Sequence, residues 1–175
     1  MNAVAAAISA KALFRDIKDE TIVKGLEKFT APLMRLEIYE LPNGIKIVDD
    51  SYNANPESMA ALVALAKEVK SGGNRVGLVV GDMLELGSHS ILAHKELGER
   101  ILALEPEFCI SVGKNSVEID KVLKDKVKSS HVNNAKDAVD LVKDYSYDVL
   151  MVKASRGIGL DEVVKSLVSE SVRST

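Results

Sequence analysis

Residues 48–59 read Val-Asp-Asp-Ser-Tyr-Asn-Ala-Asn-Pro-Glu-Ser-Met, and they join a predicted buried strand to a predicted helix. A mainly apolar run over 45–48 leads into the polar residues. Asn55 and Pro56 are typical of a helix start, because an asparagine side chain can cap the first turn and proline suits the first helical position. Apolar residues then recur at the helical period over 56–70. The polar residues therefore follow the carboxyl end of a strand, where ligands bind in an open α/β sheet.

The rest of the chain alternates short apolar runs with helical patterns. Continuous apolar runs of this length are typical of parallel strands that are covered on both faces. Strands are expected at 76–80, 108–112 and 149–152, with a weaker one at 130–132. Helices are expected at 56–70, about 89–104, about 116–127, 135–145 and 160–172. Repeated strand-helix units predict a Rossmann-like α/β fold, an open and mostly parallel sheet with helices on both faces.

A β-hairpin is predicted ahead of the parallel strands. Extended patterns at 33–41 and 45–49 flank Pro42-Asn43-Gly44, and an Asn-Gly pair between such runs is a strong hairpin signal. The parallel strands are expected to end along one edge of the sheet, at Asp49, Gly81, Gly113 and Lys153.

Two helices are predicted before the hairpin, over 2–13 and 19–29. The first consists mostly of Ala, Val, Ile and Leu, and a helix that is apolar almost all round normally requires burial. Alone, these two helices offer each other too little apolar surface for such burial. We therefore expect residues 1–32 to be a helical remnant of a preceding domain, ending in a hinge at Thr30-Ala31-Pro32, and residues 33–175 to form the α/β domain.

The composition is that of a globular protein without a nucleic-acid partner. The 175 residues are 46% hydrophobic and 28% charged, with a formal net charge of -3, which provides no basic field for a phosphate backbone. Cys109 is the one cysteine, so no internal disulfide is expected, and a reducing cytoplasmic location is favoured. No apolar stretch reaches the length of a membrane span. The three histidines lack metal-ligand spacing with each other or with Cys109, so no metal site is expected.

Phosphate-binding signatures are absent from the sequence. No Gly-x-x-x-x-Gly-Lys-Ser/Thr string occurs, so these residues encode no backbone cradle for a triphosphate. Gly157-Ile158-Gly159 is the nearest approach to a dinucleotide fingerprint, but Glu162 stands where the third glycine is needed. Hydrolysis of ATP by this chain alone is therefore not expected.

The sequence resembles the C-terminal part of the Mur ligases, and two specific strings carry the resemblance: Asp-Asp-Ser-Tyr-Asn-Ala-Asn-Pro at 49–56 and Gly-Asp-Met-Leu-Glu-Leu-Gly at 81–87. Supporting strings are His-Lys-Glu-Leu-Gly from His94 and Lys-Ala-Ser-Arg from Lys153. The resemblance spans nearly the whole chain. It is to the family member that uses ATP to join D-alanyl-D-alanine to the UDP-N-acetylmuramoyl-tripeptide precursor of the bacterial cell wall.

The resemblance implies that residues 1–32 end the central ATPase domain of that family and that residues 33–175 are the Mur ligase C-terminal domain. In the whole enzyme, this domain would close over ATP and help to bind the dipeptide. The phosphate and Mg2+ sites would belong to domains outside this chain, as would most contacts with the tripeptide. The fragment alone should be inactive.

By the same resemblance, Arg35 and Asp50 match residues that hold ATP. Asp50 suits that role because a carboxylate can accept hydrogen bonds from both hydroxyls of a ribose. The residues expected to bind D-alanyl-D-alanine are Asn53, Asn55, Lys153, Ser155 and Arg156. Asn53 and the strand end at 153–156 would form opposite walls of the crevice. No catalytic residue is expected in this chain, and Asn55 is also a candidate helix cap.

Two positions depart from the family pattern. Ala154 stands where the family usually has glycine, and Met34 stands where it usually has glycine before the arginine. Both departures leave the neighbouring charged residues in place. They therefore bear on the backbone geometry at these positions rather than on the binding chemistry. The role of His94 stays open between orienting a loop of the crevice and filling a partly buried structural position.

Two other classes of protein share the strand-helix pattern. One is a nucleotide-binding or protein-interaction module of Rossmann-like fold, since the pattern alone says nothing about activity. The other is a phosphoreceiver domain, which also has paired aspartates after a strand and a lysine after the last strand. A receiver ends its third strand with the aspartate that takes the phosphoryl group, whereas the run at 108–112 leads into Gly113-Lys114.

Overall fold

The structure, a computed structural model, describes residues 2–28 and 33–173. The chain divides into two compact units, Met1–Pro32 and Leu33–Thr175. The first unit contains α1 (Asn2–Leu13) and α2 (Asp19–Glu27), close to the predicted helices.

The first unit leaves much of its apolar surface exposed. Val4, Ile8 and Leu13 of α1 are 62%, 64% and 76% exposed, and α2 has no buried residue. Although α1 is apolar, it has 12 residues, and none of the described helices is both long and apolar enough to cross a membrane. The identity of this unit as a remnant of a preceding domain stays a prediction. The predicted hinge at 30–32 lies outside the described residues.

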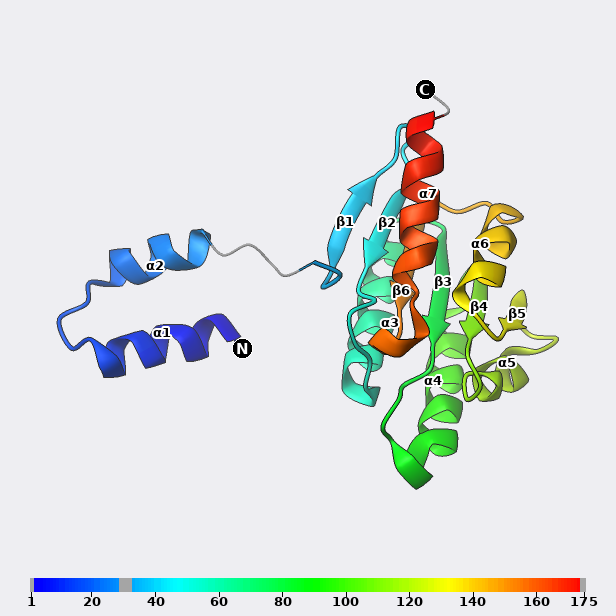
Figure 1. Cartoon of the computed structure of the whole chain (residues 1–175), viewed down its shortest axis with the longest axis horizontal. Coiled ribbons are helices and arrows are strands. Elements are labelled where there is room, and N and C mark those ends of the chain that lie inside the picture. The colour runs from blue at the N-terminus through cyan, green and yellow to red at the C-terminus, as the bar shows by residue number, and fades with distance from the viewer. Residues whose placement is uncertain (1, 29–32, 174–175) are drawn as a thin grey trace. The chain divides into compact units, whose positions relative to one another are not determined.

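The second unit is built on a six-stranded sheet with the strand order β1-β2-β6-β3-β4-β5 (Figure 1). The strands are β1 (Glu37–Glu40), β2 (Lys46–Asp49), β3 (Val76–Gly81), β4 (Phe108–Val112), β5 (Ser129–Val132) and β6 (Val149–Lys153). β1 is antiparallel to β2, and the other neighbouring pairs are parallel. The predicted Rossmann-like sheet with its N-terminal hairpin is thus confirmed.

Helices cover both faces of this sheet (Figure 1). The connections contain α3 (Pro56–Ser71), the 3-10 helix η1 (Gly87–His89), α4 (Ser90–Leu104), α5 (Val117–Leu123), α6 (Ala135–Lys143), the 3-10 helix η2 (Arg156–Ile158) and α7 (Asp161–Arg173). α3, α4 and α5 pack on one face through side chains such as Met59, Leu97 and Ile119. α6 and α7 pack on the other face, for example through Val142 and Val163.

The sheet separates two cores, and the central strand β3 contributes side chains to both of them. All of its residues are buried. Leu78 and Val80 contribute to the core under α3 and α4, whereas Val79 contributes to the core under α6 and α7. Successive side chains of a strand point to opposite faces, so a continuous apolar run is required where both faces are covered.

The first strand is shorter than the predicted 33–41. Met34 and Leu36 have φ angles of 61° and 54°, in the left-handed region that an extended strand does not use. β1 therefore begins only at Glu37. The Asn-Gly turn of the hairpin is confirmed, and Gly44 supplies its positive φ of 85°.

Two helices end earlier than predicted. α5 stops at Leu123 rather than near residue 127, since Asp125 has a left-handed φ of 62°. α6 stops at Lys143. Tyr145, predicted as helical, instead stacks its ring on Phe108, with 4.2 Å between the centroids.

Candidate functional site

The carboxyl ends of the parallel strands bring the predicted site residues to one edge of the sheet. Asp49 of β2 pairs with Val152 of β6, and Val80 of β3 pairs with Lys153. Because β6 lies between β2 and β3, the loops that follow these three strands are neighbours. The predicted alignment of the strand ends is therefore confirmed.

Lys153 and Asp50 form a nearly buried ion pair at this edge. Lys153 Nζ lies 2.5 Å from Asp50 Oδ2, and the side chains are 3% and 18% exposed. The ammonium also donates to the Asn53 carbonyl at 2.8 Å and to the Asp50 carbonyl at 3.4 Å. An ammonium has three N–H donors, so all of them are used. The sequence predicts Lys153 as a cation for a ligand, but in the structure Asp50 already neutralises that charge.

Asp50 retains one oxygen for a further partner, since its Oδ1 accepts no hydrogen bond from the described residues. Beside it lies a hollow of about 280 Å³, whose lining includes Arg35, Tyr52, Asn55 and Lys153. The Arg35 guanidinium carbon lies 4.4 Å from the centroid of the Tyr52 ring, which is cation–π geometry. A carboxylate with a free oxygen next to a flat cation fits a nucleotide, with ribose hydroxyls for Asp50 and a negatively charged phosphate for Arg35.

Asn55 caps α3, as one of the two predictions for it states. Its Oδ1 accepts the Ser58 N–H at 2.8 Å, and Ser58 Oγ accepts the Asn55 N–H at 3.0 Å. This reciprocal pair satisfies two backbone donors of the helix start. Asn53 is exposed, and its side-chain oxygen accepts the Ala54 N–H at 2.9 Å. Neither asparagine NH2 group donates a hydrogen bond within the described residues, so both amides can still contact a ligand.

Ser155 is buried and connects two of the loops. Its Oγ accepts the Leu84 N–H at 2.9 Å and lies 3.4 Å from the Ala54 carbonyl. Arg156 follows it with a side chain that is 55% exposed and an Nη1 atom 3.2 Å from Asp161 Oδ1. Ser155 therefore holds the loops together, while Arg156 presents its guanidinium at the surface.

The two predicted walls enclose a second hollow of about 280 Å³. Asn53 lies on one side, and Ser155 and Arg156 lie on the other, with Leu84 between the loops. The walls also meet directly, because the Lys153 ammonium donates to the Asn53 carbonyl. Lys153 therefore links the two walls but does not line the second hollow itself.

Asp82 is a site-edge residue for which the sequence predicted no role. It is 2% exposed, and its carboxylate accepts the N–H groups of Asn115 at 3.0 Å and Ser116 at 2.7 Å, just before α5. Gly113 has a φ of 115°, and a Cβ there would lie 2.7 Å from this carboxyl group. Asp82 thus fixes the loop after β3 to the start of α5. The sequence signal that could have pointed to Asp82 is an aspartate directly after a buried strand.

His94 holds the same loop from the side of α4. It is fully buried, its Nε2 accepts the Met83 N–H at 3.0 Å, and its Nδ1 lies 2.7 Å from the Ser90 carbonyl. These two contacts fit a neutral ring that carries its proton on Nδ1. The structure therefore places His94 inside the support of the 81–87 loop rather than at a surface that a ligand could reach.

One of the two departures from the family pattern has a local explanation, and the other places methionine where the backbone favours glycine. A Cβ at Gly81 would lie 2.7 Å from the Ala154 Cβ, so glycine in β3 makes room for alanine after β6. Met34 has a φ of 61°, a conformation that favours glycine. Its sulfur lies 2.9 Å from Arg156 Nη1. The Met34 backbone is therefore strained, while its side chain packs beside Arg156.

Within 2–28 and 33–173, no group of three or more His, Cys, Asp or Glu side chains is placed to hold a metal ion. Cys109 is fully buried in β4, and burial raises the pKa of its thiol well above the usual range. Cys109 is therefore a packing residue.

Residues 34–156 match the protein family described as Mur ligase, glutamate ligase domain. The UDP-N-acetylmuramoyl-tripeptide--D-alanyl-D-alanine ligase of Bacillus subtilis (strain 168) is 39% identical over 173 residues, covering 96% of this chain and 37% of the relative. A crystal structure of MurF from Acinetobacter baumannii matches with a TM-score of 0.80 at 27% identity, covering 96% of this chain and 37% of that one. The MurF ligase of Thermotoga maritima in complex with ADP has the same fold, with a TM-score of 0.75, 23% identity and coverage of 98% and 38%. The chain thus spans a little over a third of the length of these proteins.

Proposed function

This chain belongs to the Mur ligase family, and on that premise we propose that it is the C-terminal domain of the ATP-dependent ligase that adds D-alanyl-D-alanine to UDP-N-acetylmuramoyl-tripeptide in peptidoglycan synthesis. The Bacillus subtilis relative carries that activity in its name. Because the chain spans only part of that relative, the activity is proposed for a whole protein. Residues 1–32 would then end the central ATPase domain, and residues 33–175 would be the C-terminal domain.

The observation that best supports this function is the Lys153–Asp50 pair beside the Arg35–Tyr52 stack. Lys153 holds Asp50 with one carboxylate oxygen still open, which suits a ribose hydroxyl. Arg35 offers a cation at the same hollow. We assign these groups to ATP, and we reassign Lys153 from contact with the dipeptide to positioning of Asp50.

D-Alanyl-D-alanine is assigned to the second hollow, between Asn53 and Arg156. The dipeptide has a carboxylate, and the planar guanidinium of Arg156 can bind it with two parallel hydrogen bonds. The Asn53 amide can donate to a peptide carbonyl. Closure of this domain would orient the dipeptide, and complete alignment of reacting groups can account for about 7 to 11 kcal/mol of a barrier.

The rest of the reaction would depend on other domains. When bound, ATP would supply the phosphoryl group that activates the acid to be joined. The triphosphate cradle and Mg2+ ligands needed for that step are proposed to lie in the central domain, since this sequence contains no phosphate-loop string.

The test is a chimera in which this chain replaces the matching segment of the Bacillus subtilis relative. We expect ATP-dependent joining of D-alanyl-D-alanine to the tripeptide precursor. Asp50→Asn should raise the apparent KM for ATP about tenfold or more, because a hydrogen bond to a charged group is worth about 1.5 to 3 kcal/mol. Arg156→Ala should impair use of the dipeptide far more than use of ATP.

Asp144→Asn is the matched control, because it removes an exposed carboxylate at the end of α6 and should leave both constants unchanged. A folded chimera without ligation would contradict the proposed function. Unchanged kinetics in both site variants of an active chimera would contradict the assignment of the residues but not the function.

A further inference from the structure

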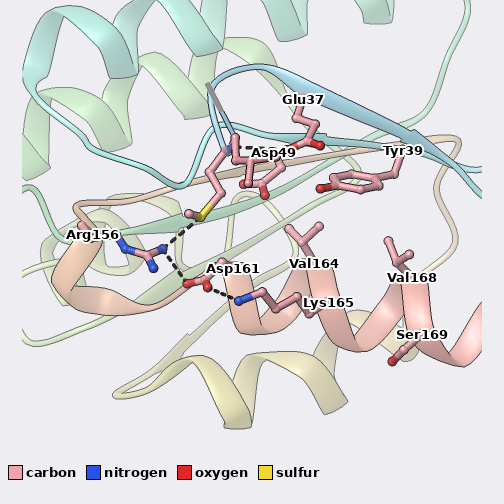
Figure 2. A pocket seen from close by; sticks show the side chains of 11 residues that line it. Glu37, Tyr39, Asp49, Arg156, Asp161, Val164, Lys165, Val168 and Ser169 are labelled. Carbon is pink, nitrogen blue, oxygen red and sulfur yellow. Dashed lines mark hydrogen bonds and ion pairs between the residues drawn. The ribbon is translucent and has the colours of Figure 1, made fainter. Parts of the chain in front are cut away.

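A hollow of about 820 Å³ lies between β1 and α7 (Figure 2). This volume is in the range of small-molecule sites. The hollow shares Arg156 with the proposed dipeptide site, and none of the other residues assigned to ATP or the dipeptide line it. An inference from this hollow therefore goes beyond the proposed ligase function.

The long walls of the hollow are apolar. Val164 and Val168 lie four residues apart on α7, so they share one face of that helix. Tyr39 of β1 lies opposite them (Figure 2). Contact with these three side chains would remove an aliphatic or aromatic group from water, which is favourable.

Two carboxylates stand at the β1–β2 side of the hollow without a cation. Asp49 is 2% exposed, and its Oδ1 accepts the Ser51 N–H at 3.0 Å, while its Oδ2 has no hydrogen bond within the described residues. Burial raises the pKa of Asp49 above its usual value, although bonds from Ser51 oppose this. Glu37 accepts the Met34 N–H at 3.2 Å. Neither carboxylate takes part in an ion pair in the described part of the chain.

The two cations that line the hollow are bound to a different carboxylate. Arg156 Nη1 lies 3.2 Å and Lys165 Nζ lies 2.7 Å from the oxygens of Asp161 (Figure 2). The lining therefore contains three carboxylates and two cations, and both cations pair with the same carboxylate, Asp161. A nearly buried carboxylate without a cation is costly, so a positive charge beside Asp49 would be favourable, and the half-buried Glu37 adds to this effect.

We propose that this hollow binds a small organic cation, with its ammonium group beside Asp49 and Glu37 and its aliphatic or aromatic body between Tyr39, Val164 and Val168. The ammonium supplies the missing charge and donates hydrogen bonds to the carboxylate oxygens. A neutral molecule of the same shape gains only the apolar contact. An anion of that shape is repelled.

Three probes of equal chain length test the proposal on the purified chain: n-hexylammonium, 1-hexanol and hexanoate. Binding is followed by NMR titration of amide and methyl signals. Hexylammonium should shift the methyl signals of Val164 and Val168 saturably. The alcohol and the anion should bind about tenfold more weakly or worse, since they lack the charge-assisted hydrogen bonds.

Variants then separate the specific site from general charge effects. Asp49→Asn and Glu37→Gln should each weaken hexylammonium binding about tenfold. Glu40→Gln is the matched control, because Glu40 is exposed on the same strand and alternates with the half-buried Glu37 and Tyr39. It should leave binding unchanged. Val168→Phe should fill the hollow and abolish binding of all three probes.

Several results would overturn the proposal. Equal affinity for the three probes would make the hollow a plain apolar groove. An equal loss in Glu40→Gln would indicate a general electrostatic effect, and shifts away from α7 would place the cation elsewhere. Self-association in sedimentation runs, with broadening at Val168, would identify a second copy as the occupant. If Asp49→Asn does not fold, Glu37→Gln on the half-buried strand face decides the same question.

Discussion

Lys153 is buried together with the carboxylate that it binds, so its contribution to stability depends on Asp50. Lys153→Met keeps an unbranched side chain but removes the ammonium that bonds Asp50 and the Asn53 carbonyl. The Asp50 side chain, which is only 18% exposed, then has no cation beside it. We expect the free energy of unfolding, measured by urea denaturation, to fall by about 1 to 3 kcal/mol.

Lys165→Met provides the matched control for this prediction. Lys165 is also paired with a carboxylate, Asp161 at 2.7 Å, but its side chain is 74% exposed. An exposed pair of this kind contributes about 0.3 to 0.5 kcal/mol. Equal losses in the two variants would show that burial of Lys153 is not what makes its ion pair important.

Asp148 carries the clearest acid-range titration in the chain. A side-chain hydrogen bond from Arg75, then its backbone N–H, lowers the pKa of Asp148 to about 2. A folded-state pKa below the unfolded value stabilises the fold above about pH 4, and this stabilisation is lost as the pH falls towards 2. An NMR titration of the Asp148 carboxyl carbon should give this low pKa, and Arg75→Gln should return it towards the usual value. An unshifted carboxyl in the unmodified chain would mean that the pair does not persist in solution.

Residue roles were predictable where the partners are close in sequence. The cap formed by Asn55 involves Ser58, three residues away, and a short string reveals it. Lys153 and Asp50 are 103 residues apart, and Asp82 is 33 residues from Asn115. Such contacts follow from the order of strands in the sheet, which one sequence does not specify. Lys153 was therefore predicted as a free cation, and Asp82 was given no role.

At the scale of elements, apolar periodicity was sufficient to find the strands and helices of the sheet. It works for β3 and β4 because helices cover both of their faces, so that the runs have no polar interruption. The errors occur at Met34, Leu36 and Asp125, where residues other than glycine adopt a positive φ. The identity of these side chains gives no sign of a positive φ. The predicted β1 and α5 were therefore too long.

The contact between β3 and the loop after β6 gives a prediction at this scale. In Gly81→Ala, the new Cβ would meet the Ala154 Cβ at 2.7 Å and the Val112 carbonyl at 3.1 Å. Overpacking of this kind costs about 1 to 3 kcal/mol in the free energy of unfolding. Adding Ala154→Gly, the usual residue of the family, removes the closer contact and should recover part of the loss in thermal or urea unfolding.

Gly25→Ala is the comparison, because no atom lies within 4 Å of the Cβ position there and the residue is in α2. It should be neutral or slightly stabilising, since alanine favours helix over glycine by about 1 kcal/mol. The steric account of Gly81 would be refuted by a double variant no more stable than Gly81→Ala alone.

For the whole molecule, the apolar helix α1 is the sequence signal from which a preceding domain is predicted. Several of its side chains are exposed, and the chain covers a little over a third of the length of its relatives. The gathering of polar side chains at the strand ends was predictable from the sequence, whereas their binding roles stay a prediction. Closure over a nucleotide stays a prediction from the family resemblance, because under the proposed function the opposing surface would belong to another domain.

The proposed division of labour between domains leads to the last prediction, that this chain alone does not turn over ATP. The sequence has no phosphate-loop string, and the described residues contain no cluster of three or more His, Cys, Asp or Glu side chains placed to hold a metal ion. With ATP and Mg2+, the purified chain should therefore release no phosphate above a matched blank, whereas the chimera should do so only with tripeptide and dipeptide present. Asp50→Asn distinguishes the chain from a contaminant, because release that persists unchanged in this variant does not come from the proposed nucleotide site. Release that falls with Asp50→Asn would show that the chain itself cleaves ATP, and the triphosphate site would then have to be sought among its own side chains.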